Sequence, residues 1–589
     1  MARRHPIFFM NHVLAIQLLT GLLFSLPFLI PIHRPPQAVF HAELVSSVLL
    51  CLLGMVIGLR FFRERLVFCW LLPVWLLLVI LVAFAQNWAG ILTYPEQAYF
   101  ALIYCSAALI AYLVGAAIHQ YDLSEAASSA VFFAVLFCGL LSVVIQLLQL
   151  FDYQALPAWM FLRLEGSWRD RPSANVGQAN ILATYLAWGL VACLTILQLK
   201  EKLVIRVMFF LMAALLSVGV TLTRSRTGLC FLFLIAALVW LPTALRMTNL
   251  ADRAVFCIVL VVGYVAGSGL VAFAVAGTGF DSASSLSRLT EQGIESRLVM
   301  WRDALTVSMM YPWVGVGFLD YASAQYMTSK YHVALVATPY VHNFILQTAV
   351  EMGWVIALGL VGILVWWVIC NFIGRAKSVP MAAFVAMVAL CLLHALVEWP
   401  LSVLSVLVPT CLMFAIVSPS ATLVSISIDM RLIVLLTSLG IVFCVLSFLE
   451  FDELSTAQIS IERSTRSGNA PSDAAINSIA SASLTSKFRP FAERILVLVQ
   501  APHLMDDSPE GLAMVRRSLW HGSDARIVTR LIYISAKAGL DDEAVEHLER
   551  LRTFHAREAP DSIAYLRQAL SGADVAAPRL LDALNGESR

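Results

Sequence analysis

The sequence has 589 residues, of which 60% are hydrophobic and only 13% are charged, and its mean hydropathy is +0.82. Water-soluble globular proteins contain roughly 45–50% apolar and about 25% charged residues, so the composition excludes a soluble globule. It predicts a polytopic membrane protein. The formal net charge of +1 gives no sign of a nucleic-acid partner.

Counting about 20 apolar residues per span, we expect an all-α protein with roughly thirteen transmembrane helices. All 11 cysteines lie in these apolar segments, so we expect neither a disulfide framework nor a zinc site. We also expect no other metal and no cofactor. The first apolar run is too long for a signal-peptide core and is expected to be a retained span. The spans are predicted to begin near residues 13, 41, 66, 98, 128, 178, 203, 227, 254, 343, 380, 401 and 431.

Lysine and arginine in the short loops predict the orientation. If the N-terminus is cytoplasmic, alternation puts most of the basic loops on the cytoplasmic side. The same alternation gathers on the opposite face four polar stretches that contain nearly all the arginines that violate this charge rule. These stretches are 151–177, 223–226, 277–341 and 398–400. Basic groups on the disfavoured side suggest an anionic substrate there.

The amino-acid composition changes along the chain and predicts three parts. Residues 1–449 form the predicted membrane domain, whose large outer loop is 276–341. Residues 450–482 are rich in Ser, Ala, Asn and Thr and read as a linker. Residues 483–589 are predicted to form a helical domain on the outer face. A helix over 526–538, a stop at Gly539 and a helix over 541–554 indicate either a tetratricopeptide-like repeat or a small helical bundle.

The large loop contains a predicted helix from about Leu286 to Met310. Arg297 and Trp301 are four residues apart on it and share a face. The alternative is a solvated helix on which Arg297 pairs with Glu291 or Glu295.

A second basic motif, Thr-Arg-Ser-Arg-Thr-Gly at 223–228, places two arginines between apolar helices. A guanidinium near bilayer depth is costly unless it faces a cavity or a partner, which makes Arg226 a site candidate. Arg224 could instead snorkel to the interface. Because the planar fork of arginine donates two parallel hydrogen bonds to an oxyanion, the two motifs suggest a pyrophosphate site that needs no divalent ion.

His342 is the candidate for handling protons, since its reference pKa is near neutral and it lies where the large loop meets an apolar run. A helix-capping role before Asn343 fits its position equally well. The run continues to about Phe372, longer than one bilayer core needs, so the span proper is expected to begin near Trp354. Glu351 is nine residues from His342, on the opposite face of a regular helix, and is left out of the catalytic set.

Further polar residues on the outer face are candidates for binding substrate. His394 and Glu398 are four residues apart and form an ionisable pair, which either orients substrate or holds two helices together. The polar stretch before the sixth span suits sugar hydroxyls, although helix capping by Asn175 is an alternative. Its candidates are Arg171, Asn175, Gln178 and Asn180.

These motifs together resemble the O-antigen ligase and polymerase superfamily of bacterial envelope enzymes. The resemblance rests on Ser225-Arg-x-Gly, Arg297 with Trp301, Pro312 before Gly315-x-Gly317, His342-Asn, and Glu351-x-Gly353. Within that superfamily, Gly-Gln-Ala-Asn at 177–180, His-Ala-Leu-Val-Glu-Trp-Pro at 394–400 and the helical tail resemble the PglL-type protein O-oligosaccharyltransferases.

The resemblance implies a GT-C-like, metal-independent glycosyltransferase in the bacterial inner membrane, with a periplasmic active site and tail. Its donor would be a glycan on undecaprenyl pyrophosphate, and its acceptor a Ser or Thr hydroxyl of a pilin or another exported protein. Arg226 and Arg297 would hold the pyrophosphate and His342 would activate or position the hydroxyl. Arg171, Asn175, Gln178, Asn180, Arg224, Trp301, His394 and Glu398 would line the substrate site.

Two alternatives remain. The same chemistry could serve lipid A core as acceptor, as in ligases, or another repeat unit, as in polymerases. A transporter of lipid-linked glycans, without bond chemistry, would favour internal repeats and charged residues at mid-membrane. Neither feature is evident in the sequence.

Overall fold

The computed structural model describes residues 6–153, 155–157, 159–164, 171–200, 202–241, 245, 247, 249–276, 293–328, 338–372, 378–418, 425–499, 508–571 and 577–585. Within these residues ten helices are long and apolar enough to cross a membrane. Three further apolar helices are shorter, namely Arg226–Trp240, Val379–Ala395 and Leu404–Val417. The predicted fold class, an all-α polytopic membrane protein, is confirmed, whereas thirteen crossings remain a prediction.

The apolar helices in chain order are α1 (Pro6–Leu23), α2 (Leu26–Leu29), α3 (Phe40–Arg60), α4 (Leu71–Trp88), α5 (Glu96–Gln120), α6 (Ser124–Leu150), α7 (Ala179–Leu199), α8 (Leu203–Leu222), α9 (Arg226–Trp240), α10 (Leu250–Val275), α15 (Trp354–Phe372), α16 (Val379–Ala395), α17 (Leu404–Val417) and α18 (Met430–Arg466). The large loop contributes α12 (Gly293–Met310) and α13 (Tyr321–Thr328), and α14 (Phe344–Met352) precedes α15. The tail contains α19 (Asp473–Thr485), α20 (Arg489–Val499), α21 (Pro509–Arg517), α22 (Ala525–Lys537), α23 (Asp541–Phe554), α24 (Ala559–Ser571) and α25 (Pro578–Asn585).

The chain divides into two compact units. The first unit comprises residues 1–76, 104–294 and 361–445, and the second comprises 77–103, 295–360 and 446–589. The tail therefore shares a unit with most of the large loop, a grouping that the predicted boundaries at 449 and 482 do not anticipate. Part of the predicted linker is helical, because α18 continues to Arg466 and α19 begins at Asp473.

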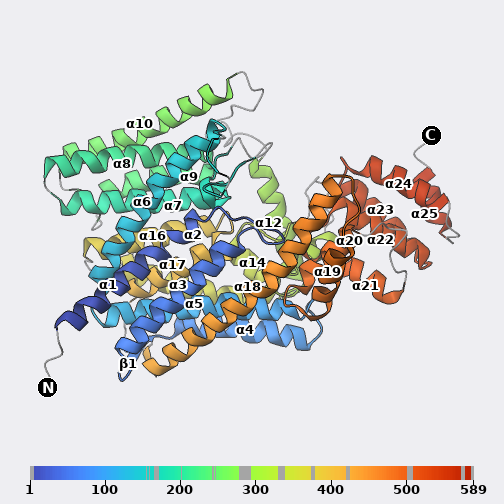
Figure 1. The fold of residues 1–589 in the computed structure, drawn as a ribbon, viewed down its shortest axis with the longest axis horizontal. Coiled ribbons are helices and arrows are strands. Elements are labelled where there is room, and N and C mark those ends of the chain that lie inside the picture. The colour runs from blue at the N-terminus through green and yellow to red at the C-terminus, as the bar shows by residue number, and fades with distance from the viewer. Residues whose placement is uncertain are drawn as a thin grey trace. The chain divides into compact units, whose positions relative to one another are not determined.

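Helix α7 is the centre of the first unit. In an 18-residue apolar stretch of this helix, 94% of the residues are buried, because α6, α8, α9 and α16 pack around it. Figure 1 shows these helices beside α7, with α8 and α10 running side by side. Polar side chains on a helix so enclosed must find partners within the protein.

A short antiparallel pair of strands in the first unit corrects one predicted boundary. Strand β1 (Arg65–Cys69) pairs with β2 (Ser425–Asp429), and Arg65 lies opposite Asp429. The span predicted to begin near residue 66 therefore begins at Leu71. The sequence of β1 is apolar enough to resemble the start of a span. Its partner strand begins 356 residues after β1 ends, so local sequence does not predict the pairing.

The run after His342 is broken into two helices, a break that its length does not predict. Helix α14 ends at Met352, and the membrane-spanning helix α15 begins at Trp354, which confirms the predicted start of the span. Gly353 between them has φ +87°, and a Cβ there would lie 2.2 Å from the carbonyl oxygen of Trp313. Only glycine fits this close contact between two backbones.

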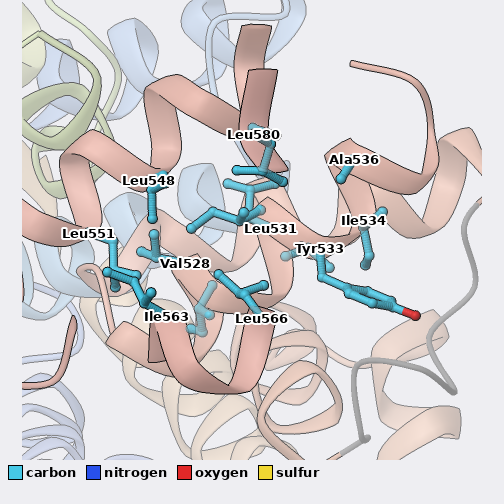
Figure 2. Packing of buried hydrophobic residues seen from close by; sticks show 14 of the residues in the cluster. Val528, Leu531, Tyr533, Ile534, Ala536, Leu548, Leu551, Ile563, Leu566 and Leu580 are labelled. Carbon is cyan, nitrogen blue, oxygen red and sulfur yellow. The ribbon is translucent and has the colours of Figure 1, made fainter. Parts of the chain in front are cut away.

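The tail is built around a core of aliphatic side chains, including Val528, Leu531, Leu548 and Leu566, that come from several of its helices (Figure 2). The predicted helical pair is present, with Gly539 at φ +74° between α22 and α23. The same core includes Tyr326 of the loop helix α13, which is fully buried. The tail and α13 thus share one core.

Candidate active site

The backbone at His342 has the left-handed conformation that non-glycine residues rarely adopt, with φ +57°. Such a conformation costs on the order of 1–3 kcal/mol and persists only where neighbouring contacts hold it. On its N-terminal side, the Val341 N–H donates to Gln347 Oε1 at 2.6 Å. On its C-terminal side, Asn343 Oδ1 caps α14 by accepting from the Leu346 N–H at 3.0 Å. Asn343, rather than His342, therefore caps the helix.

Trp301 connects α12 to this segment. Its indole Nε1 donates to the carbonyl oxygen of Val341 at 3.1 Å, and Val341 packs in a buried cluster with Ala304 and Val350. Arg297 is half-buried on the same helix, one turn before Trp301. The structure therefore ties the Arg297 helix to the residue next to His342, within one unit.

The glycines of the motif at 312–317 form a joint between two backbone segments. The Val316 N–H donates to the Val350 carbonyl at 2.8 Å, and the Trp354 N–H donates to the Pro312 carbonyl at 2.9 Å. A Cβ on Gly315, at φ +69°, would lie 2.3 Å from the backbone carbon of Glu351. The joint holds the turn after α12 against the end of α14.

Glu351 is buried in this region and is hydrogen-bonded to Gln347. It is only 4% exposed, and its Oε1 accepts from Gln347 Nε2 at 2.6 Å. Burial raises the pKa of Glu351 to about 8, against the opposing effect of the Gln347 bond. Gln347, which links Glu351 to Val341, was not among the predicted site residues. The signal that could have found it is its spacing of four residues from Glu351 on one helix face.

The second basic motif lies in the first unit, at the start of α9. Ser225 caps this helix, its Oγ accepting from the Gly228 N–H at 3.2 Å. Arg226 is the first residue of the helix and is half-buried. Arg224 has φ +50° and is only 2% exposed, so it does not snorkel to an exposed position.

A polar network joins the other candidates of the first unit. Asn180 Oδ1 accepts from Arg171 Nη2 at 2.7 Å, and Asn180 Nδ2 donates to Glu398 Oε1 at 2.7 Å. One turn further along α7, Thr184 Oγ1 lies 2.6 Å from His394 Nδ1. His394 and Glu398 thus each contact α7, which favours the helix-holding interpretation of this pair.

Asn175 and Gln178 make hydrogen bonds that organise the chain before α7. The side chain of Asn175 donates to the Leu29 carbonyl at 2.7 Å and accepts from the Leu162 N–H at 2.9 Å. Gln178, rather than Asn175, caps α7, with its Oε1 2.6 Å from the Ile181 nitrogen. Their contribution to sugar binding stays a prediction.

The structure therefore gathers the predicted residues into two groups. Arg297, Trp301 and His342 belong to the second unit, and Arg226 belongs to the first with Arg171, Asn180, His394 and Glu398. The convergence of Arg226 with Arg297 and His342 stays a prediction.

Part of the chain is similar in sequence to known proteins. Residues 210–361, which contain Arg226, Arg297 and His342, match the family described as O-antigen ligase. The chain is also 27% identical over 402 residues to a protein named general O-oligosaccharyltransferase from Acinetobacter baylyi. The match covers 65% of this chain and spans 66%, just under two thirds, of that relative's length.

Proposed function

We propose that this chain, a member of the O-antigen ligase family with a protein O-oligosaccharyltransferase among its relatives, transfers a glycan to hydroxyl groups of exported proteins. The donor is a glycan on undecaprenyl pyrophosphate, and the acceptor is a Ser or Thr hydroxyl of a pilin or another exported protein. The observation that carries this proposal is the pair of hydrogen bonds that hold Val341, the residue before His342. One comes from Trp301, on the helix of Arg297, and the other goes to Gln347. All these residues lie within the stretch that matches the family.

In the proposed reaction the acceptor oxygen attacks the anomeric carbon of the donor glycan. The bond between that carbon and the pyrophosphate oxygen breaks, and the bonding electrons leave with the pyrophosphate. His342 accepts or orients the proton of the acceptor hydroxyl. Arg297 and Arg226 stabilise the charge that develops on the pyrophosphate, an effect that is commonly the largest in transfer chemistry. The reaction needs no divalent ion, because the guanidinium groups supply the positive charge.

The proposed location is the periplasmic face of the bacterial inner membrane. The distribution of lysine and arginine supports a cytoplasmic N-terminus, and alternation of spans then puts the large loop and the tail in the periplasm. Labelling of Leu484→Cys by a membrane-impermeant maleimide tests this arrangement, since Leu484 of the tail is 80% exposed. Labelling from the periplasmic side supports the orientation, and protection there contradicts it.

Purified protein given a lipid-linked glycan and either pilin or lipid A core tests the acceptor. Glycosylated pilin with release of undecaprenyl pyrophosphate is the expected result. Modification of lipid A core alone would identify a ligase, and lengthening of the lipid-linked glycan would identify a polymerase. Consumption of no donor in any arm would favour the transporter. Activity that is lost with a chelator and restored by a divalent ion would contradict the metal-independent mechanism.

A further inference from the structure

The Glu351 carboxyl group lies between two segments of strained backbone in the second unit. Leu319, in the turn after α12, has φ +62°, and His342 has φ +57°. The Leu319 N–H donates to the Glu351 carboxyl group, and Gln347 Nε2 donates to its Oε1 at 2.6 Å. One buried side chain thus contacts Leu319 directly and reaches the His342 segment through Gln347.

The amide of Gln347 has only one orientation that fits its surroundings. Its Oε1 accepts from the Val341 N–H at 2.6 Å, and its Nε2 donates to the Pro339 carbonyl at 3.0 Å as well as to Glu351. A flipped amide would turn its NH₂ group toward the Val341 N–H and its oxygen toward two acceptors. Glu351 therefore fixes the amide that holds the residues just before His342.

We propose that Glu351 is a positioning residue that holds the backbone of His342 in its left-handed conformation through Gln347. This inference rests on the proposed function of His342. A carboxyl group suits the task because either of its oxygens can accept, whereas a glutamine would put an NH₂ group, which only donates, in place of one of them. The loss of one acceptor from a buried site is expected to be costly.

An exchange of the two side chains tests the inference. Glu351→Gln puts an NH₂ group in place of one of the two carboxyl oxygens, beside the donors Gln347 Nε2 and Leu319 N–H. In Gln347→Glu, two carboxyl oxygens would stand where Nε2 and Oε1 are now 2.6 Å apart. The double variant Gln347→Glu, Glu351→Gln restores donor-to-acceptor pairing with Val341, with Leu319 and between the two side chains. It also places a carboxyl oxygen opposite the Pro339 carbonyl, to which Nε2 now donates at 3.0 Å.

The readouts are kcat and KM for the lipid-linked donor in the proposed transfer assay, together with the midpoint of thermal unfolding in detergent. We expect each single variant to lower kcat roughly tenfold or more with little change in KM, and the double variant to recover part of the loss. Thr348→Val is the matched control. Thr348 lies on the same helix, and among the described residues its Oγ1 bonds only to the Phe344 carbonyl of that helix, at 2.8 Å. It should retain wild-type kcat.

Unchanged kcat in both single variants would overturn the inference, as would a double variant no better than the singles. If a single variant does not fold, the double variant is compared directly with wild type. Activity within tenfold of wild type then supports the inference, and a loss as large as that of His342→Ala overturns it. Failure of the proposed function is distinguishable, since wild-type protein would then transfer no glycan at all.

Discussion

The indole N–H of Trp301 donates to the carbonyl oxygen of Val341 at 3.1 Å, so a helix of the large loop is bonded to the residue that precedes His342. Val341 is bonded at both ends, because its own N–H donates to Gln347 at 2.6 Å. The position of His342 therefore depends on α12 as well as on α14.

Replacing Trp301 by Phe should lower kcat about fivefold, since it removes one neutral hydrogen bond worth about 1 kcal/mol while keeping an aromatic ring in the cluster. Trp354→Phe is the control, because the Nε1 of Trp354 has no hydrogen-bond partner among the described residues. Glycan transfer by the two variants is measured under the same conditions. Equal activity of both variants would contradict a positioning role for Trp301.

Gly353→Ala should destabilise the protein by about 2 kcal/mol or more, because the residue has φ +87° and a Cβ would lie 2.2 Å from the Trp313 carbonyl oxygen. Gly362→Ala in α15 is the matched control, since a Cβ there meets nothing within 4 Å. Thermal unfolding in detergent compares the two. A Gly353→Ala protein as stable as the Gly362→Ala protein would show that the joint tolerates a side chain.

Asn180→Ala should reduce stability by about 1–3 kcal/mol while leaving KM for the donor unchanged. The substitution removes the amide that bridges Arg171 and Glu398 at 2.7 Å on each side, and it leaves the buried carboxylate of Glu398 without this donor. Unfolding temperature and KM separate the two roles. A raised KM at unchanged stability would favour the substrate-binding interpretation.

The contact between Tyr326 and the tail should contribute strongly to stability. The Tyr326 ring is fully buried, its hydroxyl lies 3.2 Å from His547 Nδ1, and Arg550 lies over the ring at 5.3 Å. Tyr326→Ala is expected to cost about 3–5 kcal/mol, as for other large buried rings. Tyr565→Ala, at a residue that is 37% exposed in α24, should cost little by comparison. Limited proteolysis of the tail and thermal unfolding measure both, and equal stability of the two variants would contradict this account.

Acid should weaken the same contact. Burial lowers the pKa of His547, so the folded protein keeps this ring neutral at a pH where the unfolded chain takes up a proton. The stability from this residue is complete above the unfolded pKa of about 6.5 and declines as the pH falls below it. Unfolding temperatures between about pH 8 and pH 5 should therefore fall less steeply in His547→Gln than in wild type. Identical slopes would contradict the burial effect.

The sequence predicts the apolar helices and the start of a span near Trp354 because span length is a local property. Gly539 likewise predicts the helical pair of the tail. The pairing of β1 with β2 could not be predicted in this way, since it joins Arg65 to Asp429 across most of the chain.

The contacts of the candidate site are also tertiary. Helical spacing places Glu351 opposite His342, but His342 lies before α14, which begins at Phe344, so that spacing does not apply to it. Nor could the sequence reveal that Gln347 joins Glu351 to Val341. Nor does it reveal that Tyr326 of the loop completes the core of the tail. Both are contacts made by tertiary packing.

The central claim is that Arg226, Arg297 and His342 act together on a lipid-linked glycan. The most direct measurement is mass spectrometry of an exported acceptor protein after incubation with lipid-linked glycan and purified wild-type, Arg226→Ala, Arg297→Ala or His342→Ala protein, each shown to be folded. The account predicts a glycosylated acceptor with wild-type protein and a fall in transfer rate on the order of a hundredfold or more with each variant. Wild-type rates of acceptor glycosylation in all three variants would contradict it.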